Sequence, residues 1–161
     1  METGSEKRED RSGDRRAARV PIRSYRDLDV YQRSMNLLRP LQSVLAKLPA
    51  VEQYELASQM RRASKSIPAN IAEGYGRKRS AKEFKFHLGV ALGSANEMIV
   101  HLEIAVAVGY AEHRDVGELI AAYEVLARQL YRLLEKWQDF GADSARREER
   151  PASRVSHLAS S

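Results

Sequence analysis

Residues 80–109 read SAKEFKFHLGVALGSANEMIVHLEIAVAVG, and this stretch decides the fold. It opens with Ser80-Ala81-Lys82-Glu83, which matches a helix capping box. Apolar side chains then recur at strictly alternating spacings of four and three residues, at Phe84, Leu88, Ala91, Ala95, Met98, Leu102 and Ala105. Sustained heptad spacing is typical of a helix that faces partner helices, and Gly109 is suited to end it.

Three flanking segments have the same periodicity. The first, 27–48, has Asp27 as its expected N-cap and Pro40 inside it, where we expect a kink. Its predicted apolar face comprises Leu28, Tyr31, Met35, Leu38 and Leu45. The second, 52–73, carries Leu56, Met60, Ala63 and Ile67, followed by Pro68, where we expect a bend or a restart. Gly74 and Gly76 suit its end, where positive backbone angles are often needed.

The fourth segment starts near Asp115 and repeats the heptad spacing through Val116, Leu119, Tyr123, Leu126, Leu130, Leu133 and Trp137. No stretch alternates with period two over the length of a strand. Connections of about 3–8 residues make neighbouring helices antiparallel. The sequence therefore predicts an all-α fold, an antiparallel up-down-up-down four-helix bundle, over residues 24–137.

The two ends of the chain differ from this core. Residues 1–23 hold seven Lys or Arg and five Asp or Glu with few large apolar side chains, and residues 138–161 are similarly polar. Such segments bury too little apolar surface to offset the entropy of ordering. We predict a disordered charged tail at each end, 1–23 and 138–161.

Composition narrows the functional classes. The 161 residues include no cysteine, and their mean hydropathy is −0.53. No uninterrupted apolar run approaches the roughly 18 residues of a membrane span, and no apolar region of a secretory signal is present. We expect a cytoplasmic protein without disulfides and with no membrane partner. No nucleophile, base and orienting group occur in a recognisable arrangement, so we do not expect an enzyme.

Two Glu-x-x-x-His pairs, Glu83/His87 and Glu97/His101, raise the question of a metal site. Di-iron bundles use a spacing of three and need further carboxylates from facing helices. At a spacing of four, such a pair usually forms a contact on one helix surface. We therefore predict no metal site and no cofactor.

The charge is concentrated in one region. From Arg61 to Lys85 there are eight Lys or Arg and two Glu, whereas the whole chain carries only +5. We predict that a basic patch binds a nucleic-acid backbone with little sequence preference, through Arg61, Arg62, Lys65, Arg77, Lys78 and Arg79, with Lys82 and Lys85 peripheral. Tyr75 could stack on a base, and the helix start near Ser80 could hold a phosphate. The alternative is that these cations pair with acids such as Glu97, Glu103 or Glu118.

A further motif, Gly89-x-x-x-Gly93, lies within the third helical segment. Each interior glycine costs a helix roughly 1 kcal/mol relative to alanine, so a close approach by another helix is the expected compensation. That helix belongs either to the same bundle or to a neighbouring subunit.

The chain resembles a family of small four-helix-bundle proteins encoded in intervening sequences of bacterial large-subunit ribosomal RNA genes. The resemblance spans Tyr25 to Trp137 and rests on Asp27-Leu28-x-Val30-Tyr31-Gln32, Ser58–Arg77, Ser80-x-x-Glu83-Phe84, Ala91-Leu92-Gly93-Ser94-x-x-Glu97 and Gly109-Tyr110. Tyr31 stands where members often have Trp, and Pro40 and the charged tails are atypical.

The resemblance implies a homopentamer with a basic surface around its axis. The accessory variability determinant of diversity-generating retroelements is similar to this family, and it binds nucleic acid and a reverse transcriptase. The resemblance therefore adds two candidate partners, RNA or DNA and a reverse transcriptase. A second functional hypothesis follows from it: an interaction scaffold that docks an acidic protein partner.

Overall fold

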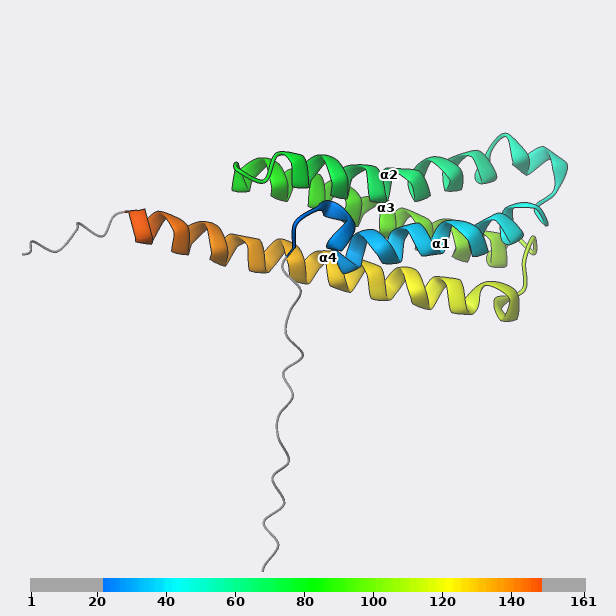
Figure 1. The fold of residues 1–161 in the computed structure, drawn as a ribbon. Coiled ribbons are helices and arrows are strands. Elements are labelled where there is room, and N and C mark those ends of the chain that lie inside the picture. Colours follow the sequence, from blue (N-terminus) through cyan, green and yellow to red (C-terminus); the bar gives the residue numbers. More distant parts are fainter. Residues whose placement is uncertain (1–21, 149–161) are drawn as a thin grey trace, which may run out of the picture.

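Four antiparallel helices form one bundle in the computed structural model, which describes residues 22–148, and their side chains as far as Trp137 (Figure 1). The helices are α1 (Asp29–Leu45), α2 (Leu56–Gly76), α3 (Ala81–Ala107) and α4 (His113–Glu148). Short 3-10 helices, η1 (Tyr25–Asp27) and η2 (Ala50–Gln53), precede α1 and α2. Helix α3 packs between α2 and α4, and α1 lies against α2 and α4. The predicted all-α four-helix bundle is confirmed.

Helix α3 forms as its heptad pattern predicts. Its seven predicted core residues are fully buried, from Phe84 to Ala105. The Ser80 hydroxyl accepts a hydrogen bond from the Glu83 amide at 3.3 Å, which caps the first turn. At the other end Gly109 has φ +79°, and the Tyr110 amide donates to the Ala105 carbonyl at 2.8 Å. This is a Schellman-type ending that glycine permits without strain.

The N-cap prediction for the first helix is wrong. The Asp27 carboxylate accepts hydrogen bonds from the amides of Arg23 and Ser24, at 2.9 and 2.8 Å, and so caps η1. Leu28 occupies the N-cap position of α1 without a side-chain hydrogen bond. Because of this extra 3-10 turn, Asp27 caps η1 and does not cap α1.

The predicted face of α1 is only partly correct: Leu28 and Leu45 are buried as predicted, but the middle of the face is displaced. The buried line of this helix comprises Val30, Ser34, Leu37, Leu41, Val44 and Leu45, whereas Met35 is 42% exposed and Tyr31 and Leu38 are only partly buried. Two apolar lines compete along this helix, and the line richer in aliphatic side chains faces the core. Tyr31, Met35 and Leu38 consequently lie on the flank of α1.

Neither internal proline divides its helix. Helix α1 runs from Asp29 to Leu45 through Pro40, and α2 is one element through Pro68, so the restart considered for the second helix does not occur. Pro68 is buried between Ile67 and Ile71, both of which are core residues. Packing on either side of the proline holds the helix together despite the lost backbone donor.

The C-terminal helix continues beyond the predicted domain boundary at Trp137. Helix α4 extends to Glu148, and its last turns pass beyond the ends of the other helices in Figure 1. The rest of the predicted tails, residues 1–21 and 149–161, lie outside the described residues.

The core contains one polar group whose removal is expected to stabilise the fold. Tyr123 is 1% exposed, its hydroxyl has no hydrogen-bond partner among the described residues, and burial raises its pKa. Tyr123→Phe removes this uncompensated polar group and keeps the ring, so the free energy of unfolding should rise by about 1 kcal/mol. Urea denaturation of both proteins measures it, and a lower midpoint for the variant would contradict the assignment.

Candidate nucleic-acid interface

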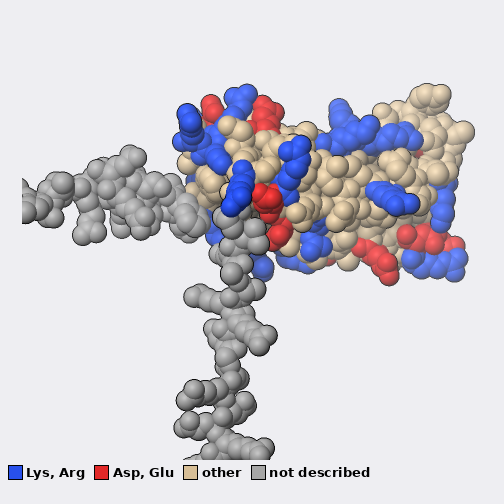
Figure 2. All heavy atoms as spheres, in the orientation of Figure 1, with Lys and Arg blue, Asp and Glu red and all other residues tan. Residues whose placement is uncertain are grey.

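The basic patch, defined as Arg61, Arg62, Lys65, Arg77, Lys78 and Arg79, has two parts. The first three residues lie in the first half of α2, and the other three form its C-terminal end and the turn into α3. Figure 2 shows Lys and Arg gathered at the end of the bundle where α2 passes into α3, with acidic groups among them, and others along the upper edge formed by α2. Arg62 and Arg77 are separated by about 22 Å along the helix axis.

Arg61 is held by neutral acceptors. Its guanidinium donates to the carbonyl oxygen and to Oε1 of Gln53, at 3.1 and 2.7 Å. The Gln53 amide in turn donates to the carbonyls of Leu45 and Leu48 at the end of α1. Arg61 therefore ties α2 to the connection from α1, and its charge meets no carboxylate among the described residues. It contributes to the field of the patch from a fixed, half-buried position.

Arg62 and Lys65 lie outward. The Arg62 side chain is 79% exposed, and its Nη2 lies 3.8 Å from Oε1 of Glu97 on α3. The same Glu97 oxygen lies 3.2 Å from Nε2 of His101, so the predicted Glu97/His101 contact is present. An ion pair this exposed and this long contributes little to stability, and Arg62 can leave it for a phosphate at small cost. Pairing with Glu97, the alternative considered for these cations, is thus present in a weak form.

The second part of the patch combines one compensated cation with two less constrained ones. The Arg77 guanidinium donates to Glu73 at 3.1 Å. The Lys78 ammonium lies 3.8 Å from the centroid of the Tyr75 ring. The Tyr75 hydroxyl is buried without a partner among the described residues. Lys78 covers one face of the Tyr75 ring and the hydroxyl end points inward, so a base would have to displace Lys78 to stack on that face. Arg79 is exposed.

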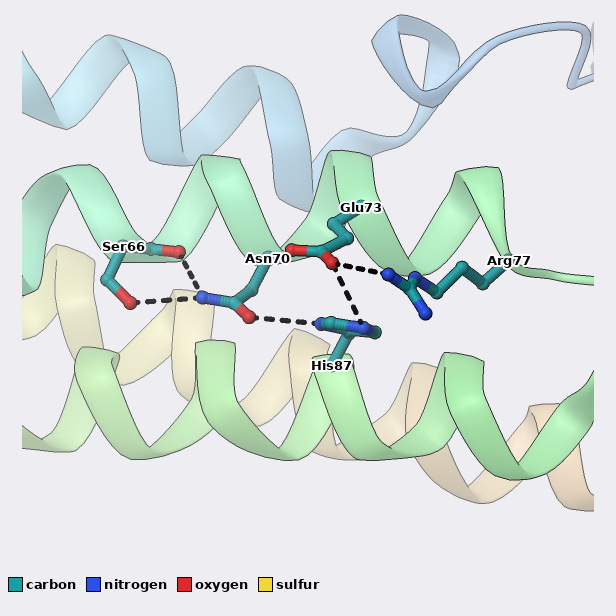
Figure 3. Close-up of polar contacts among 5 residues, drawn as sticks. All are labelled: Ser66, Asn70, Glu73, Arg77 and His87. Carbon is teal, nitrogen blue, oxygen red and sulfur yellow. Dashed lines mark hydrogen bonds and ion pairs between the residues drawn. The ribbon is translucent and has the colours of Figure 1, made fainter.

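A polar network joins α2 to α3 beneath the second part of the patch (Figure 3). The Asn70 amide donates to the carbonyl and the hydroxyl of Ser66, at 2.9 and 3.1 Å, so its Oδ1 faces Nδ1 of His87 at 3.2 Å. Nε2 of His87 lies 3.7 Å from Glu73, the carboxylate that also binds Arg77. His87 thus contacts α2 and not its predicted partner Glu83. Sequence spacing on one helix does not reveal a partner on another.

Gly74 allows this close helix contact. A Cβ atom at this position would lie 2.9 Å from Cβ of His87 and 3.1 Å from the Phe84 ring. Among the described glycines only Gly109 has a positive φ, so the reason predicted for Gly74 and Gly76 is wrong. Gly74 is required by packing, whereas a Cβ at Gly76 would meet nothing within 4 Å.

The outer face of α3 is largely apolar and carries the glycine pair, although Glu97, which contacts Arg62, also lies on it. We define it as Gly89 and Gly93 together with the exposed residues Phe86, Val90, Val100, Ile104 and Val108. A Cβ at either glycine would meet nothing within 4 Å, so no helix of the described bundle approaches them. Of the two explanations predicted for the Gly-x-x-x-Gly motif, the one within the bundle is wrong.

Apolar residues lie on two sides of α3. By its length and composition alone this helix could therefore cross a membrane, although charged residues interrupt it. Its most apolar window is 39% buried inside the bundle, and core helices of water-soluble proteins meet the same criterion.

Comparison with models of protein families gives a match. The model of the family described as 23S rRNA-intervening sequence protein matches residues 26–132, nearly the whole span of the bundle. The comparison with curated proteins gives no match.

Proposed function

The chain belongs to the 23S rRNA-intervening sequence protein family, and we propose that it is a non-enzymatic homo-oligomer that binds nucleic-acid backbone through the basic patch. The supporting observation is that most of these cations have no carboxylate close to them. Among the described residues, only Arg62 and Arg77 of the six have a carboxylate within 4.0 Å, and the Arg62 pair is long and exposed. The patch therefore keeps most of its charge for an external anion.

Geometry supports backbone contact without sequence reading. Phosphates along one strand of duplex DNA repeat every 3.4 Å of helix axis, so about 22 Å between Arg62 and Arg77 corresponds to roughly six phosphates. Long, exposed Arg and Lys side chains adapt to such a repeat with little demand on base identity. The Ser80 hydroxyl already accepts a hydrogen bond from the Glu83 amide, so this amide is not free for a phosphate. The start of α3 is therefore a weaker phosphate site than the sequence suggested.

The outer face of α3 supports the oligomeric part of the proposal. Five exposed large apolar residues lie on this side, around two glycines with open space above them and with the acidic residue Glu97 among them. Such a surface fits a helix from another copy better than it fits water. Five copies, the number that the family resemblance implies, would repeat the basic patch and raise avidity for a long polyanion.

The same basic patch favours a second candidate function, an interaction scaffold for an acidic protein such as a reverse transcriptase, because exposed cations attract carboxylates as well as phosphates. In that role the chain would resemble the accessory variability determinant, which binds a reverse transcriptase. A protein complex that survives nuclease treatment and is lost on mutation of Arg62 and Lys65 would support the scaffold in place of nucleic-acid binding.

Two double variants, one in the basic patch and one on α4, test the nucleic-acid proposal when they are compared. Arg62→Ala with Lys65→Ala is expected to weaken binding of a fluorescein-labelled oligonucleotide at least tenfold near physiological salt, because two phosphate contacts are lost. The matched control is Arg128→Ala with Arg132→Ala, which removes the same charge from α4. Fluorescence anisotropy measures both. Equal losses in the two variants would mean that net charge, not the patch, determines affinity.

A further inference from the structure

A groove of about 300 Å³ lies between the beginning of α1 and the middle of α2, next to the first part of the basic patch. It exists because the buried line of α1 leaves Tyr31 and Met35 on the flank that faces α2. Its lining includes Tyr25, Tyr31, Met35, Lys65, Pro68 and Ala69. The volume lies at the lower limit for small-molecule sites, so it suits one or two flat rings and not a large ligand.

The walls of the groove are aromatic and apolar. The Tyr25 and Tyr31 rings meet edge to face, with centroids 4.9 Å apart. On the opposite side the groove is lined by Pro68 and Ala69, and the small side chain of Ala69 lets a flat ring approach α2 closely. A flat apolar group that enters the groove therefore displaces water from a lining with few hydrogen-bonding groups.

Two cations lie at the groove. Lys65 belongs both to the lining and to the basic patch, and the Arg26 guanidinium lies 4.6 Å from the centroid of the Tyr25 ring. None of the lining residues is acidic. A flat apolar surface beside cations fits a group that carries a planar ring next to a phosphate.

We propose that this groove takes an unpaired nucleobase of a single-stranded nucleic acid whose backbone lies on Arg62 and Lys65. The inference rests on the proposed function and narrows its substrate class. Bases of a duplex are stacked and paired and cannot enter the groove, whereas each base of a single strand presents a free ring face. The protein should therefore bind a single strand more tightly than a duplex of equal length.

An abasic strand separates base binding from backbone binding. Anisotropy titrations of the full chain use a mixed-sequence DNA strand of about 12 nucleotides and an abasic strand of equal length and charge. Stacking of one base contributes about 1–3 kcal/mol, so the base-containing strand should bind roughly 5- to 150-fold more tightly. Equal affinities would overturn the groove proposal and leave backbone binding intact, whereas no binding of either strand would remove the proposed function as well.

A variant that fills the groove assigns the preference to this site. Ala69 is exposed, so Ala69→Leu places bulk in the groove without changing charge or core packing. It should lower the ratio of the two affinities to about one and leave the affinity for the abasic strand unchanged. Ala121→Leu, at an exposed position on α4, is the control and should keep the wild-type ratio. Circular dichroism melting checks that both variants fold. An unchanged ratio in a folded Ala69→Leu variant would overturn the proposal.

Discussion

Replacement of both Val100 and Ile104 with glutamate is expected to leave a folded monomer. The two residues are 50% and 40% exposed in the centre of the outer face of α3, so two charges there do not disturb the core of a single bundle. In an interface between copies the same charges would be desolvated without partners, which costs several kcal/mol for each subunit pair. Sedimentation velocity should show the assembly of the wild-type protein replaced by one species with the mass of a single chain.

The control for this experiment keeps the change in charge and moves it elsewhere. Val51 and Tyr54 are 67% and 88% exposed near η2, and their replacement with glutamate should preserve the assembly. Gly93→Ala gives an independent signature: about 1 kcal/mol of added helix stability in the subunit and weaker association, because the new methyl group keeps the other helix away. A wild-type chain that sediments as a monomer would contradict the oligomeric proposal.

Gly74→Ala is expected to lower the free energy of unfolding by about 2 kcal/mol. The new methyl group would lie 2.9 Å from Cβ of His87, an atom fixed to the backbone of α3, so α2 and α3 must separate. Overpacking typically costs about 1–3 kcal/mol, and the gain in helix propensity, roughly 1 kcal/mol, offsets only part of a cost at the upper end. Urea denaturation measures the difference.

Gly76→Ala is the matched control for this prediction. Gly76 lies in the last turn of the same helix, and a methyl group there meets nothing within 4 Å. Its stability should be unchanged or rise by up to about 1 kcal/mol. If Gly74→Ala proves as stable as Gly76→Ala, the close contact between α2 and α3 is not where the structure places it.

The bundle could be predicted from the sequence because α3 and α4 each carry one unambiguous heptad line. The predicted core residues of α2 and α3 are buried, and those of α4 are buried or partly buried. In α1 two apolar lines compete, and only tertiary packing decides that Leu37 and Leu41 face the core while Met35 does not. The groove beside α2 could not be predicted because it results from that choice.

The cations of the candidate site were evident from the sequence, but their partners were not. Arg61 binds Gln53 eight residues earlier, and His87 binds Asn70 on another helix. These contacts depend on how helices meet, which residue spacing within one helix does not encode. The concentration of cations between residues 61 and 85 is thus evident from the sequence, whereas the contact of Arg61 with Gln53 and the packing that requires Gly74 depend on the tertiary structure.

The slope of log Kd against log salt concentration, for a single-stranded oligonucleotide and the full chain, measures most directly whether these cations neutralise phosphates. Each neutralised phosphate contributes about 0.7 to the slope. We expect a linear, strongly salt-dependent affinity for the wild-type protein, and a slope lower by about 1.4 when Arg62 and Lys65 are both alanine. A slope that the double replacement leaves unchanged, or an affinity independent of salt, would contradict backbone binding through the basic patch.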